Sequence, residues 1–271
     1  MKEVLKFPQG VAPEGAKEHN FRTLELSNFR TSSASLTLVI PVYKEAPRLP
    51  ASLESIRTFA QRDTGMEVEV IFVDDGSPDD SVAIIAAYIA QHNLTNFRQI
   101  SYQPNRGKGY AVKTGILAAT GDLVLMSDTD LSTPLDDFAK LKSALDAGAD
   151  IACGSRAVAG AHIGVKPPLR RRISSRVFNL LVRMAGVRGI RDTQCGFKLF
   201  RTPAAKHIFG QLRTERFAFD VEMIAKARKL GYRLIEVPVN WNYNDNSTVR
   251  LLSSGSRMVF DIALIALRRL I

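Results

Sequence analysis

The stretch Leu123-Val-Leu-Met-Ser-Asp128-Thr-Asp130 decides the fold prediction for this chain. A short apolar run of strand length ends in two carboxylates that are separated by one residue. Because alternate side chains of an extended backbone point to the same side, Asp128 and Asp130 are expected to project together. Two such carboxylates suit Mg²⁺ or Mn²⁺, which keep other coordination positions for water and substrate phosphates. Asp-x-Asp before Ser132 and Pro134 is also typical of a turn or a helix cap, which is the default use of Asp, so the motif alone leaves both interpretations open.

Alternating apolar strands and amphipathic helices surround this stretch. The pattern predicts strands at Leu36–Val42, Val68–Val73, Phe97–Tyr102, Leu123–Ser127, Ile151–Cys153 and Leu234–Val239. It predicts helices at about Leu49–Gln61, Asp79–Gln91, Lys108–Ala119 and Leu135–Ala147. Units of this size predict an α/β fold with a mostly parallel, right-handed, doubly wound sheet. Ligands of such sheets gather at the carboxyl ends of the strands, which favours the metal interpretation of the aspartates.

Composition and cysteine usage limit the possible classes of protein. With 271 residues, of which 45% are apolar, the chain can bury a large core and form one large α/β domain or two small ones. Cys153 and Cys195 lack any metal-ligand spacing and predict free thiols in a reducing compartment. The first residues lack the apolar core of a signal peptide, and no stretch approaches the ~20 apolar residues of a membrane span. We therefore expect a cytoplasmic protein.

Charge is distributed unevenly between the two halves of the chain. Residues 1–150 hold 15 Lys and Arg against 20 Asp and Glu, a net charge of −5, whereas residues 151–271 hold 22 against 7, a net charge of +15. The acidic half is expected to collect metal, and the basic half to attract phosphates of a nucleic acid or of an anionic membrane. Residues 1–35 have no clear period and are predicted to form an arm of unassigned function.

Three loops that follow predicted strands carry further candidate residues. Tyr43 and Glu45 follow the first strand and could flank a base and a ribose. Asp74 and Asp75 follow the second strand, where a cap or a turn is the competing interpretation. Lys108 lies in a glycine-rich helix start, where free N–H groups favour phosphate but a plain turn is equally consistent. The chain lacks both Gly-x-Gly-x-x-Gly after the first strand and a phosphate-loop motif, so neither a dinucleotide-binding dehydrogenase nor a P-loop ATPase is favoured.

Two basic segments of the second half run directly into apolar ones. Arg170-Arg-Arg172 precedes the mostly apolar Val177–Met184, and the segment from Arg257 to Ile271 is again apolar and arginine-rich. An apolar helix behind a cationic start suits a lipid headgroup region better than a nucleic acid, which would more often require exposed aromatic residues or a known reading motif. An ordinary core-facing helix with a solvated basic edge stays an alternative for both segments.

Six motifs follow one another along the chain. They are Pro41-Val-Tyr-Lys-Glu45, Val73-Asp-Asp-Gly-Ser-Pro-Asp79, Asn105-Arg-Gly-Lys-Gly109, Asp128-Thr-Asp130, Gly154-Ser-Arg156 and Arg191-Asp-Thr-Gln-Cys-Gly-Phe-Lys-Leu-Phe200. Taken in this order, they resemble the motifs of family 2 glycosyltransferases of the GT-A fold, and most closely those of the dolichyl-phosphate β-glucosyltransferases and related polyprenyl-phosphate sugar transferases. The resemblance runs from about Leu36 to Ile271, and two blocks, Arg191–Phe200 and Arg213–Asp220, are the more specific to the glucosyl branch.

The resemblance implies a role for individual residues. A base and ribose pocket would be lined by Pro41, Tyr43 and Glu45, and Asp74 would read the uracil edge. Asp130 would ligate the metal, with Asp128 beside the sugar and diphosphate. The residues predicted to bind the nucleotide sugar are Pro41, Tyr43, Glu45, Asp74, Asp75, Lys108 and Asp128.

The acceptor phosphate is implied to lie on Arg156, Arg171 and Ser175. Asp192 is a candidate catalytic base or an orienting group, with a structural cap before Gly196 as the alternative. Two positions depart from the family pattern. Thr129 stands where relatives often have Ala, and Ser132 stands where they often have Gln as a further metal ligand.

The resemblance implies one GT-A domain over residues 36–271, divided into a nucleotide-sugar half, 36–155, and an acceptor half, 156–271. The expected reaction is inverting transfer of glucose from UDP-glucose to a dolichyl or undecaprenyl phosphate, with Mg²⁺ or Mn²⁺ as cofactor. The enzyme is expected at the cytoplasmic face of a membrane, with peripheral contact and no nucleic acid partner. The alternatives are transfer of mannose or another hexose from a GDP- or UDP-sugar, a sugar nucleotidyltransferase, and a binding protein for polyanions or anionic membranes.

Overall fold

The computed structural model describes residues 34–62, 65–165, 168, 178, 180, 182, 189–242, 261–265 and 267. The chain divides into two units, residues 1–32 and 33–271, and the fold described below belongs to the second unit. The predicted arm, residues 1–35, lies outside the described residues except for its last two. Arg171 and Ser175, the two acceptor residues predicted beside Arg156, lie outside them as well.

A central sheet organises the described part of the chain. Its strands lie in the order β3-β2-β1-β4-β7-β5-β8. The neighbouring pairs among β1, β2, β3 and β4, and the pair β5 and β8, run parallel, while β7 runs antiparallel to both β4 and β5. The mostly parallel α/β sheet predicted from the sequence is therefore confirmed. The strands are β1 (Ser35–Val42), β2 (Glu67–Asp74), β3 (Phe97–Ser101), β4 (Leu123–Met126), β5 (Ile151–Ser155), β7 (Lys198–Arg201) and β8 (Leu234–Pro238), and a separate small sheet pairs β6 (His162–Ile163) with β9 (Asn240–Trp241).

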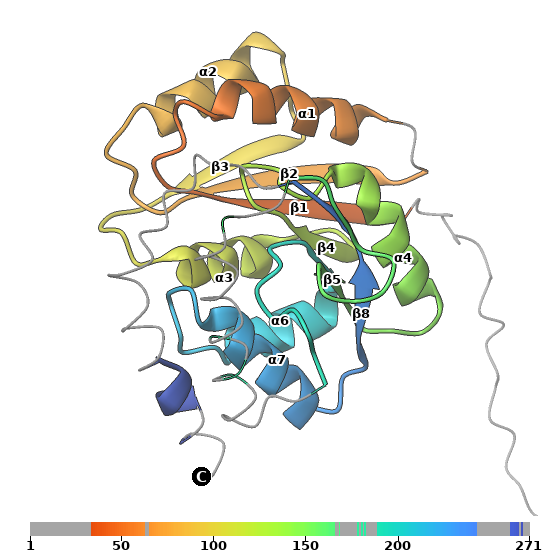
Figure 1. Ribbon diagram of the computed structural model, residues 1–271. Helices are drawn as coiled ribbons and strands as arrows, with labels where there is room; N and C mark the ends of the chain where they lie inside the picture. The colour runs from red at the N-terminus through yellow and green to blue at the C-terminus, as the bar shows by residue number, and fades with distance from the viewer. Residues whose placement is uncertain are drawn as a thin grey trace, which may run out of the picture. The chain divides into compact units, whose positions relative to one another are not determined.

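Helices cover both faces of the sheet, with α1 and α2 on one side and α3, α6 and α7 on the other (Figure 1). Successive side chains of β1 point to opposite faces of the sheet. Leu38 and Ile40 are buried in the core under α1 and α4, whereas Val39 is buried in the core under α3. Burial of both faces explains the continuous apolar strands of the sequence. The helices are α1 (Leu49–Gln61), α2 (Ser81–Gln91), α3 (Lys108–Ala118), α4 (Phe138–Asp146), α6 (Thr202–Gly210) and α7 (Phe219–Lys229), with a 3₁₀ turn at Leu135–Asp137.

Two predicted helices begin later than the sequence pattern suggested. Helix α2 begins at Ser81 rather than Asp79, because the Asp79 carboxylate accepts hydrogen bonds from the Ser81 hydroxyl at 2.6 Å and from the Ala46 backbone N–H at 3.2 Å. The helix predicted from Leu135 starts with the 3₁₀ turn and becomes regular only at Phe138. Strand β7 was not predicted, because its four residues carry charges at both ends and give no alternating pattern.

The basic apolar segments of the second half contribute to the core. Val182, Ile262 and Ile265 are buried in the cluster under α3, α6 and α7. Leu180 and Leu267, in the same segments, are 57% and 56% exposed. The core-facing alternative therefore holds for part of each segment. Nowhere in the described residues does a helix combine the length and the apolar character needed to cross a membrane.

Candidate active site

The two aspartates that follow β4 lie where the carboxyl ends of β1 and β4 meet. The Ser127 N–H donates to the Val39 carbonyl at 3.1 Å, which extends the pairing of the two strands by one residue. Thr129 is buried, and its hydroxyl donates to the Pro41 carbonyl at 2.7 Å. The hydroxyl that distinguishes Thr129 from alanine thus ties the motif to β1. Asp128 and Asp130, on either side of it, remain partly exposed.

Asp128 lies between a lysine and a glycine. Its Oδ1 forms an ion pair with Lys108 Nζ, at the start of α3. Its carboxylate also fills the space beside Gly196, where an added Cβ would lie 2.7 Å from Oδ1. Burial opposes ionisation of Asp128, but the surrounding cations, led by Lys108, hold its pKa below the ordinary value. Asp128 is therefore an anion that is fixed in place before any ligand binds.

Glu45 completes the acidic side of the site. Its Oε2 lies 2.6 Å from Arg48 Nη2, without the geometry of a hydrogen bond. The pKa of Glu45 is raised to about 7, mainly by burial, which Arg48 opposes and the charges of Asp130 and Asp128 assist. Glu45 thus interacts electrostatically with both Asp128 and Asp130. Nearby, Tyr43 has 36% of its surface exposed.

The carboxylates at the end of β2 hold loops of the chain. Asp74 accepts hydrogen bonds from the backbone N–H groups of Gly76 and Ser77 at 3.2 and 3.1 Å. Asp75 is saturated, since its two oxygens accept four hydrogen bonds of 2.7–2.9 Å. The donors are the Tyr102 hydroxyl, the Asn105 side chain and the backbone N–H groups of Arg106 and Gly107.

The hydrogen bonds of Asp75 give it a structural role beside the predicted contact with the nucleotide sugar, which stays a prediction. Its carboxylate is buried and has four donors, so it supports the glycine-rich loop. Gly107 in that loop has a φ of +114°, a region that side chains rarely adopt, and the loop packs on residues 214–219. Lys108 is thereby presented at the end of a rigid turn.

Arg156 and Asp192 form the second cluster of the site. Arg156 Nε and Nη2 donate to the two oxygens of Asp192 at 2.7 and 2.8 Å, and the Arg156 backbone N–H donates to Oδ2 at 3.0 Å. The guanidinium carbon also lies 5.2 Å from the centre of the Trp241 ring. Burial opposes ionisation of Asp192, but Arg156 holds its pKa below the ordinary value. Asp192 is 5% exposed and has both oxygens engaged, so it is placed to orient Arg156, and its geometry argues against a catalytic base.

The sequence interpretation assigned no role to Lys198 or Asp220, which form a buried ion pair under the site. Lys198 Nζ lies 2.7 Å from Asp220 Oδ1, and the two side chains are 0% and 5% exposed. A charged residue within the apolar run Phe197-Lys-Leu-Phe200 was the signal that could have identified this pair. The two charges lie close enough to influence the pKa of Lys108 and Asp128.

A divalent cation suits the donors at the end of β4. Asp128 and Asp130 supply hard oxygen atoms, and Asp130 is ordered by a hydrogen bond of 3.0 Å from the Ser132 N–H to its Oδ1. Among the described residues, no group of three acidic, His or Cys side chains is arranged to hold a metal ion. Mg²⁺ and Mn²⁺ commonly complete their coordination with water and substrate phosphates, so the two carboxylates are a sufficient protein contribution.

The sequence profile of Glycosyl transferase family 2 matches residues 37–209, which span β1 to α6 and all the acidic loops described above. The chain belongs to glycosyltransferase family 2. Three of its similar relatives are dolichyl-phosphate β-glucosyltransferases. The Dictyostelium discoideum enzyme is 36% identical over 94% of this chain and 81% of its own length. The human enzyme is 36% identical over 87% of this chain and 76% of its own length. The Saccharomyces cerevisiae enzyme is 33% identical over 87% of this chain and 75% of its own length.

Solved structures confirm the GT-A fold of this glycosyltransferase. Glucosyl-3-phosphoglycerate synthase from Mycobacterium tuberculosis, in complex with Mn²⁺, UDP and glucosyl-3-phosphoglycerate, superposes with a TM-score of 0.62 at 17% identity, covering 87% of this chain and 80% of that one. A mannosyltransferase from Pyrobaculum calidifontis, in complex with GDP-Man and Mn²⁺, superposes with a TM-score of 0.60 at 20% identity, covering 84% of this chain and 64% of that one. At these identities the likeness concerns the fold alone.

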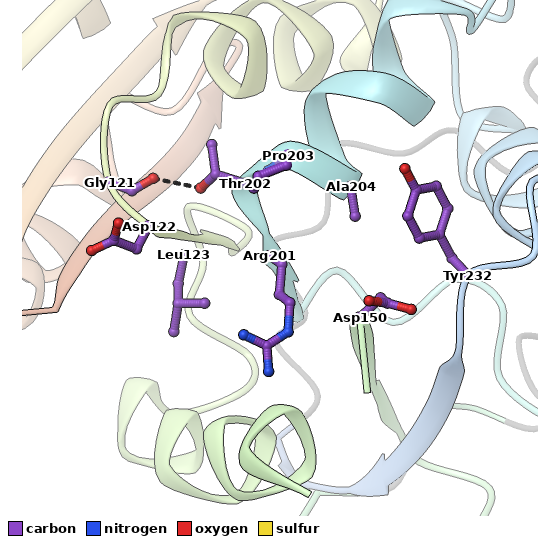
Figure 2. A pocket seen from close by; sticks show the side chains of 9 residues that line it. All are labelled: Gly121, Asp122, Leu123, Asp150, Arg201, Thr202, Pro203, Ala204 and Tyr232. Carbon is purple, nitrogen blue, oxygen red and sulfur yellow. Dashed lines mark hydrogen bonds between the residues drawn. The ribbon is translucent and has the colours of Figure 1, made fainter. Parts of the chain in front are cut away.

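A surface pocket of the glycosyltransferase (Figure 2) is lined by none of these site residues. It has a volume of about 560 Å³ and is lined at the amino ends of β4 and β5, by Asp122, Leu123 and Asp150 among others. The acidic residues instead follow the carboxyl end of β4, as ligand sites of open α/β sheets do. Arg201, at the far end of β7 from Lys198, borders this pocket (Figure 2). The pocket therefore has no part in the active site.

Proposed function

We propose that this glycosyltransferase transfers glucose from UDP-glucose to a polyprenyl phosphate, with inversion at the anomeric carbon and with Mg²⁺ or Mn²⁺. The observation that carries the proposal is that one electrostatically coupled site contains the carboxylates Asp128 and Asp130 together with Arg156. The Arg156 guanidinium is held in place because it donates two hydrogen bonds to the carboxylate of a buried aspartate, Asp192. The first group suits a metal-bound diphosphate, and the second suits a phosphate monoester.

Several features support UDP-glucose as the donor. The curated relatives are named β-glucosyltransferases, and fold neighbours were solved with UDP, UDP-glucose and Mn²⁺. In this chain, Lys108 and the N-terminus of α3 offer positive charge to a diphosphate. Tyr43, partly exposed beside the acidic loop, is available to stack on a base.

Arg156 is the residue best suited to hold the acceptor. A guanidinium binds phosphate through parallel hydrogen bonds, and Asp192 fixes its plane in advance, so little conformational entropy is lost on binding. The Arg156 side chain as a whole keeps 29% of its surface exposed, which leaves it accessible to an acceptor. Lipid phosphates of the kind named in the relatives have a second pKa of about 6, so the nucleophile is already largely ionised at neutral pH and needs no strong base.

The reaction then needs only alignment and charge stabilisation. An acceptor phosphate oxygen attacks the anomeric carbon of glucose and forms the new bond, while the bond from that carbon to the β-phosphate oxygen breaks and UDP leaves. Attack opposite the leaving group inverts the configuration. A divalent cation supplies neutralisation of the diphosphate charge when it is bound. Asp128 and Asp130 would hold that cation, Lys108 would contact the diphosphate, and Arg156 would orient the attacking phosphate.

We further propose peripheral contact with the cytoplasmic face of a membrane. The net charge of +15 over residues 151–271 suits an anionic surface, at about 1 kcal/mol for each basic residue near it. Leu180 and Leu267 expose more than half of their surface within the basic apolar segments, as residues that enter a lipid interface would.

The test is transfer of label from a panel of radiolabelled sugar nucleotides to a water-soluble, short-chain polyprenyl phosphate. Lipid-linked β-glucose from UDP-glucose, dependent on Mn²⁺ or Mg²⁺, is the expected result. Preferential transfer from GDP-mannose would identify that sugar nucleotide, and not UDP-glucose, as the donor. Formation of a UDP-sugar and pyrophosphate from a sugar phosphate and UTP would indicate a nucleotidyltransferase. Vesicle binding without transfer of any sugar would leave only a membrane-binding role.

A further inference from the structure

Lys198 is a charged residue in the middle of the sheet. On β7 it pairs with Met126 of β4 on one side and with Cys153 of β5 on the other. Its side chain is 0% exposed, and its ammonium group donates to Asp220 Oδ1 at 2.7 Å and to the Cys195 carbonyl oxygen. Lysines are almost never fully buried unless they are paired, because removing the charge from water is costly. This position therefore requires an explanation beyond packing.

The two partners of Lys198 belong to different walls of the site. The Cys195 carbonyl lies in the turn that leads into Gly196, and Gly196 lies against the carboxylate of Asp128. Asp220 lies in the first turn of α7. The Lys198 ammonium thus connects the turn under Asp128 to the start of a helix on the other side of the core.

The start of α7 also contacts the glycine-rich loop. An added Cβ at Gly109 would lie 2.7 Å from Phe219 Cβ and 2.9 Å from the carbonyl oxygens of Thr214 and Arg216. The Tyr110 N–H, in the first turn of α3, donates to the Glu215 carbonyl at 2.9 Å. Movement of α7 would therefore shift the turn that presents Lys108.

We propose that Lys198 is a positioning residue for donor binding. Its ammonium group joins the Cys195–Gly196 turn to α7, and this connection holds Asp128 and Lys108 in the arrangement that binds a metal-complexed nucleoside diphosphate. The proposal rests on the proposed function for the identity of that ligand. Lys198 also places a fixed positive charge under the acidic residues, and this charge contributes to the low pKa of both Asp128 and Asp192. It touches no reacting atom itself.

The competing explanation is that the Lys198–Asp220 pair only stabilises the fold. Removal of one partner cannot separate the two, because an unpaired buried charge destabilises a protein whatever its role. Removal of both charges can. The variant Lys198→Met/Asp220→Asn keeps similar side-chain volumes and leaves neither charge uncompensated, so its thermal midpoint is expected to exceed that of Lys198→Met alone.

The experiment measures thermal midpoint, Mn²⁺ affinity by electron paramagnetic resonance, and UDP affinity with Mn²⁺ by calorimetry. The double variant is expected to recover most of the stability lost in Lys198→Met, yet to bind Mn²⁺ and UDP at least tenfold more weakly than the unaltered protein. Wild-type affinity in the folded double variant overturns the proposal. Lys198→Met/Asp220→Leu removes the same two charges and leaves no hydrogen bond between the two positions, so it is a second test if the first double variant does not fold, and unchanged UDP affinity there would overturn the proposal as well.

Arg201→Met is the matched control. Arg201 lies at the other end of β7 and donates to the Leu145 and Ala149 carbonyls at 2.7 and 3.3 Å. It is expected to lower the thermal midpoint without changing affinity for Mn²⁺ or UDP. Glucosyl transfer by the unaltered protein is measured separately. Absence of transfer with UDP binding retained would contradict the proposed function, while the affinities of the variants would still decide the role of Lys198.

Discussion

The carboxylate of Asp128 occupies the space that a side chain at Gly196 would need. An alanine Cβ there would lie 2.7 Å from Oδ1 and closer still to Oδ2, which no real Cβ tolerates. Gly196 follows Cys195 in the turn before β7, so two strands that are distant in sequence meet at one carboxylate. This contact explains why the turn needs glycine at position 196. Without a side chain there, the Asp128 carboxylate can lie against the backbone.

Gly196→Ala is therefore expected to displace Asp128 and to lower kcat on the order of 10²-fold, because a misplacement of about 1 Å in a catalytic arrangement has an effect of that size. The fold should survive, because the substitution is at the surface of the site. Gly210→Ala is the control, since nothing lies within 4 Å of a Cβ there. Kinetics and circular dichroism of both variants check the prediction, and an active Gly196→Ala enzyme would contradict it.

Asp130→Asn tests the metal site. The amide keeps the size of the side chain and can still accept the hydrogen bond from the Ser132 N–H, so the turn should be retained. Loss of the carboxylate charge is expected to weaken Mn²⁺ binding by at least tenfold and to reduce transfer to background. EDTA should produce the same loss in the unaltered enzyme. Full activity in EDTA, after removal of metal by dialysis, would exclude a metal role for Asp130.

The carboxyl-end loops show why part of the site could be predicted from the sequence. The apolar runs of β1, β2 and β4 fix the edge at which Asp74 and Asp128 emerge, because strand periodicity and sheet topology are local signals. The partner of each carboxylate is not a local signal. Asp75 is engaged by residues about 30 positions later, and Lys198 and Asp220 meet only because β7 inserts between β4 and β5. Antiparallel β7, four residues long, has no pattern from which its place could be read.

Glu45 predicts a pH-dependent stability. Its pKa in the folded protein is raised to about 7 from the ordinary value of 4.5, mainly by burial and then by Asp130 and Asp128. The folded state therefore binds its proton more tightly than the unfolded state, so the contribution of this group to stability is full below pH 4.5 and is lost as the pH rises to about 7. Allowing for solvent screening, the change is about 1 to 2 kcal/mol.

Glu45→Gln removes this titration. Denaturant unfolding in EDTA should give the variant the higher free energy of unfolding at pH 8 and nearly the same value as the unaltered protein at pH 5. Added Mn²⁺ should reduce the difference at pH 8, because a cation beside Asp130 favours the ionised Glu45. A difference between the two proteins that does not change with pH would show that Glu45 ionises normally.

Nucleotide preference can be read from thermal protection. Any ligand that binds only the native state raises its stability by about 2.7 kcal/mol at a concentration of 100 Kd. With Mn²⁺ present, UDP is expected to raise the melting temperature more than GDP at equal concentration. The same measurement on Lys108→Met, which removes the proposed diphosphate contact, should show less protection by UDP. Stronger protection by GDP would favour a guanosine donor.

Substitutions of Arg156 test the proposed acceptor site. Arg156→Lys keeps the positive charge but loses the planar pair of hydrogen bonds to Asp192, and lysine cannot reproduce a two-point contact with phosphate. The apparent KM for polyprenyl phosphate is therefore expected to rise about tenfold in Arg156→Lys and further in Arg156→Ala, with the KM for UDP-glucose nearly unchanged. A general electrostatic patch instead predicts that Arg156→Lys has no effect.

Asp192→Asn separates orientation from base catalysis. If Asp192 only holds Arg156, the asparagine variant should raise the acceptor KM as Arg156→Lys does, because its amide oxygen can accept only one of the two guanidinium hydrogen bonds. The pH dependence of kcat should stay unchanged, because Asp192 then takes up no proton in the reaction. A catalytic base would behave differently, since its loss lowers kcat at every pH and removes the acidic limb of the profile. Steady-state kinetics between pH 5 and 9 with a short-chain acceptor decide between them. Because Arg156 holds the pKa of Asp192 low and engages both of its oxygens, we expect the change to appear in KM.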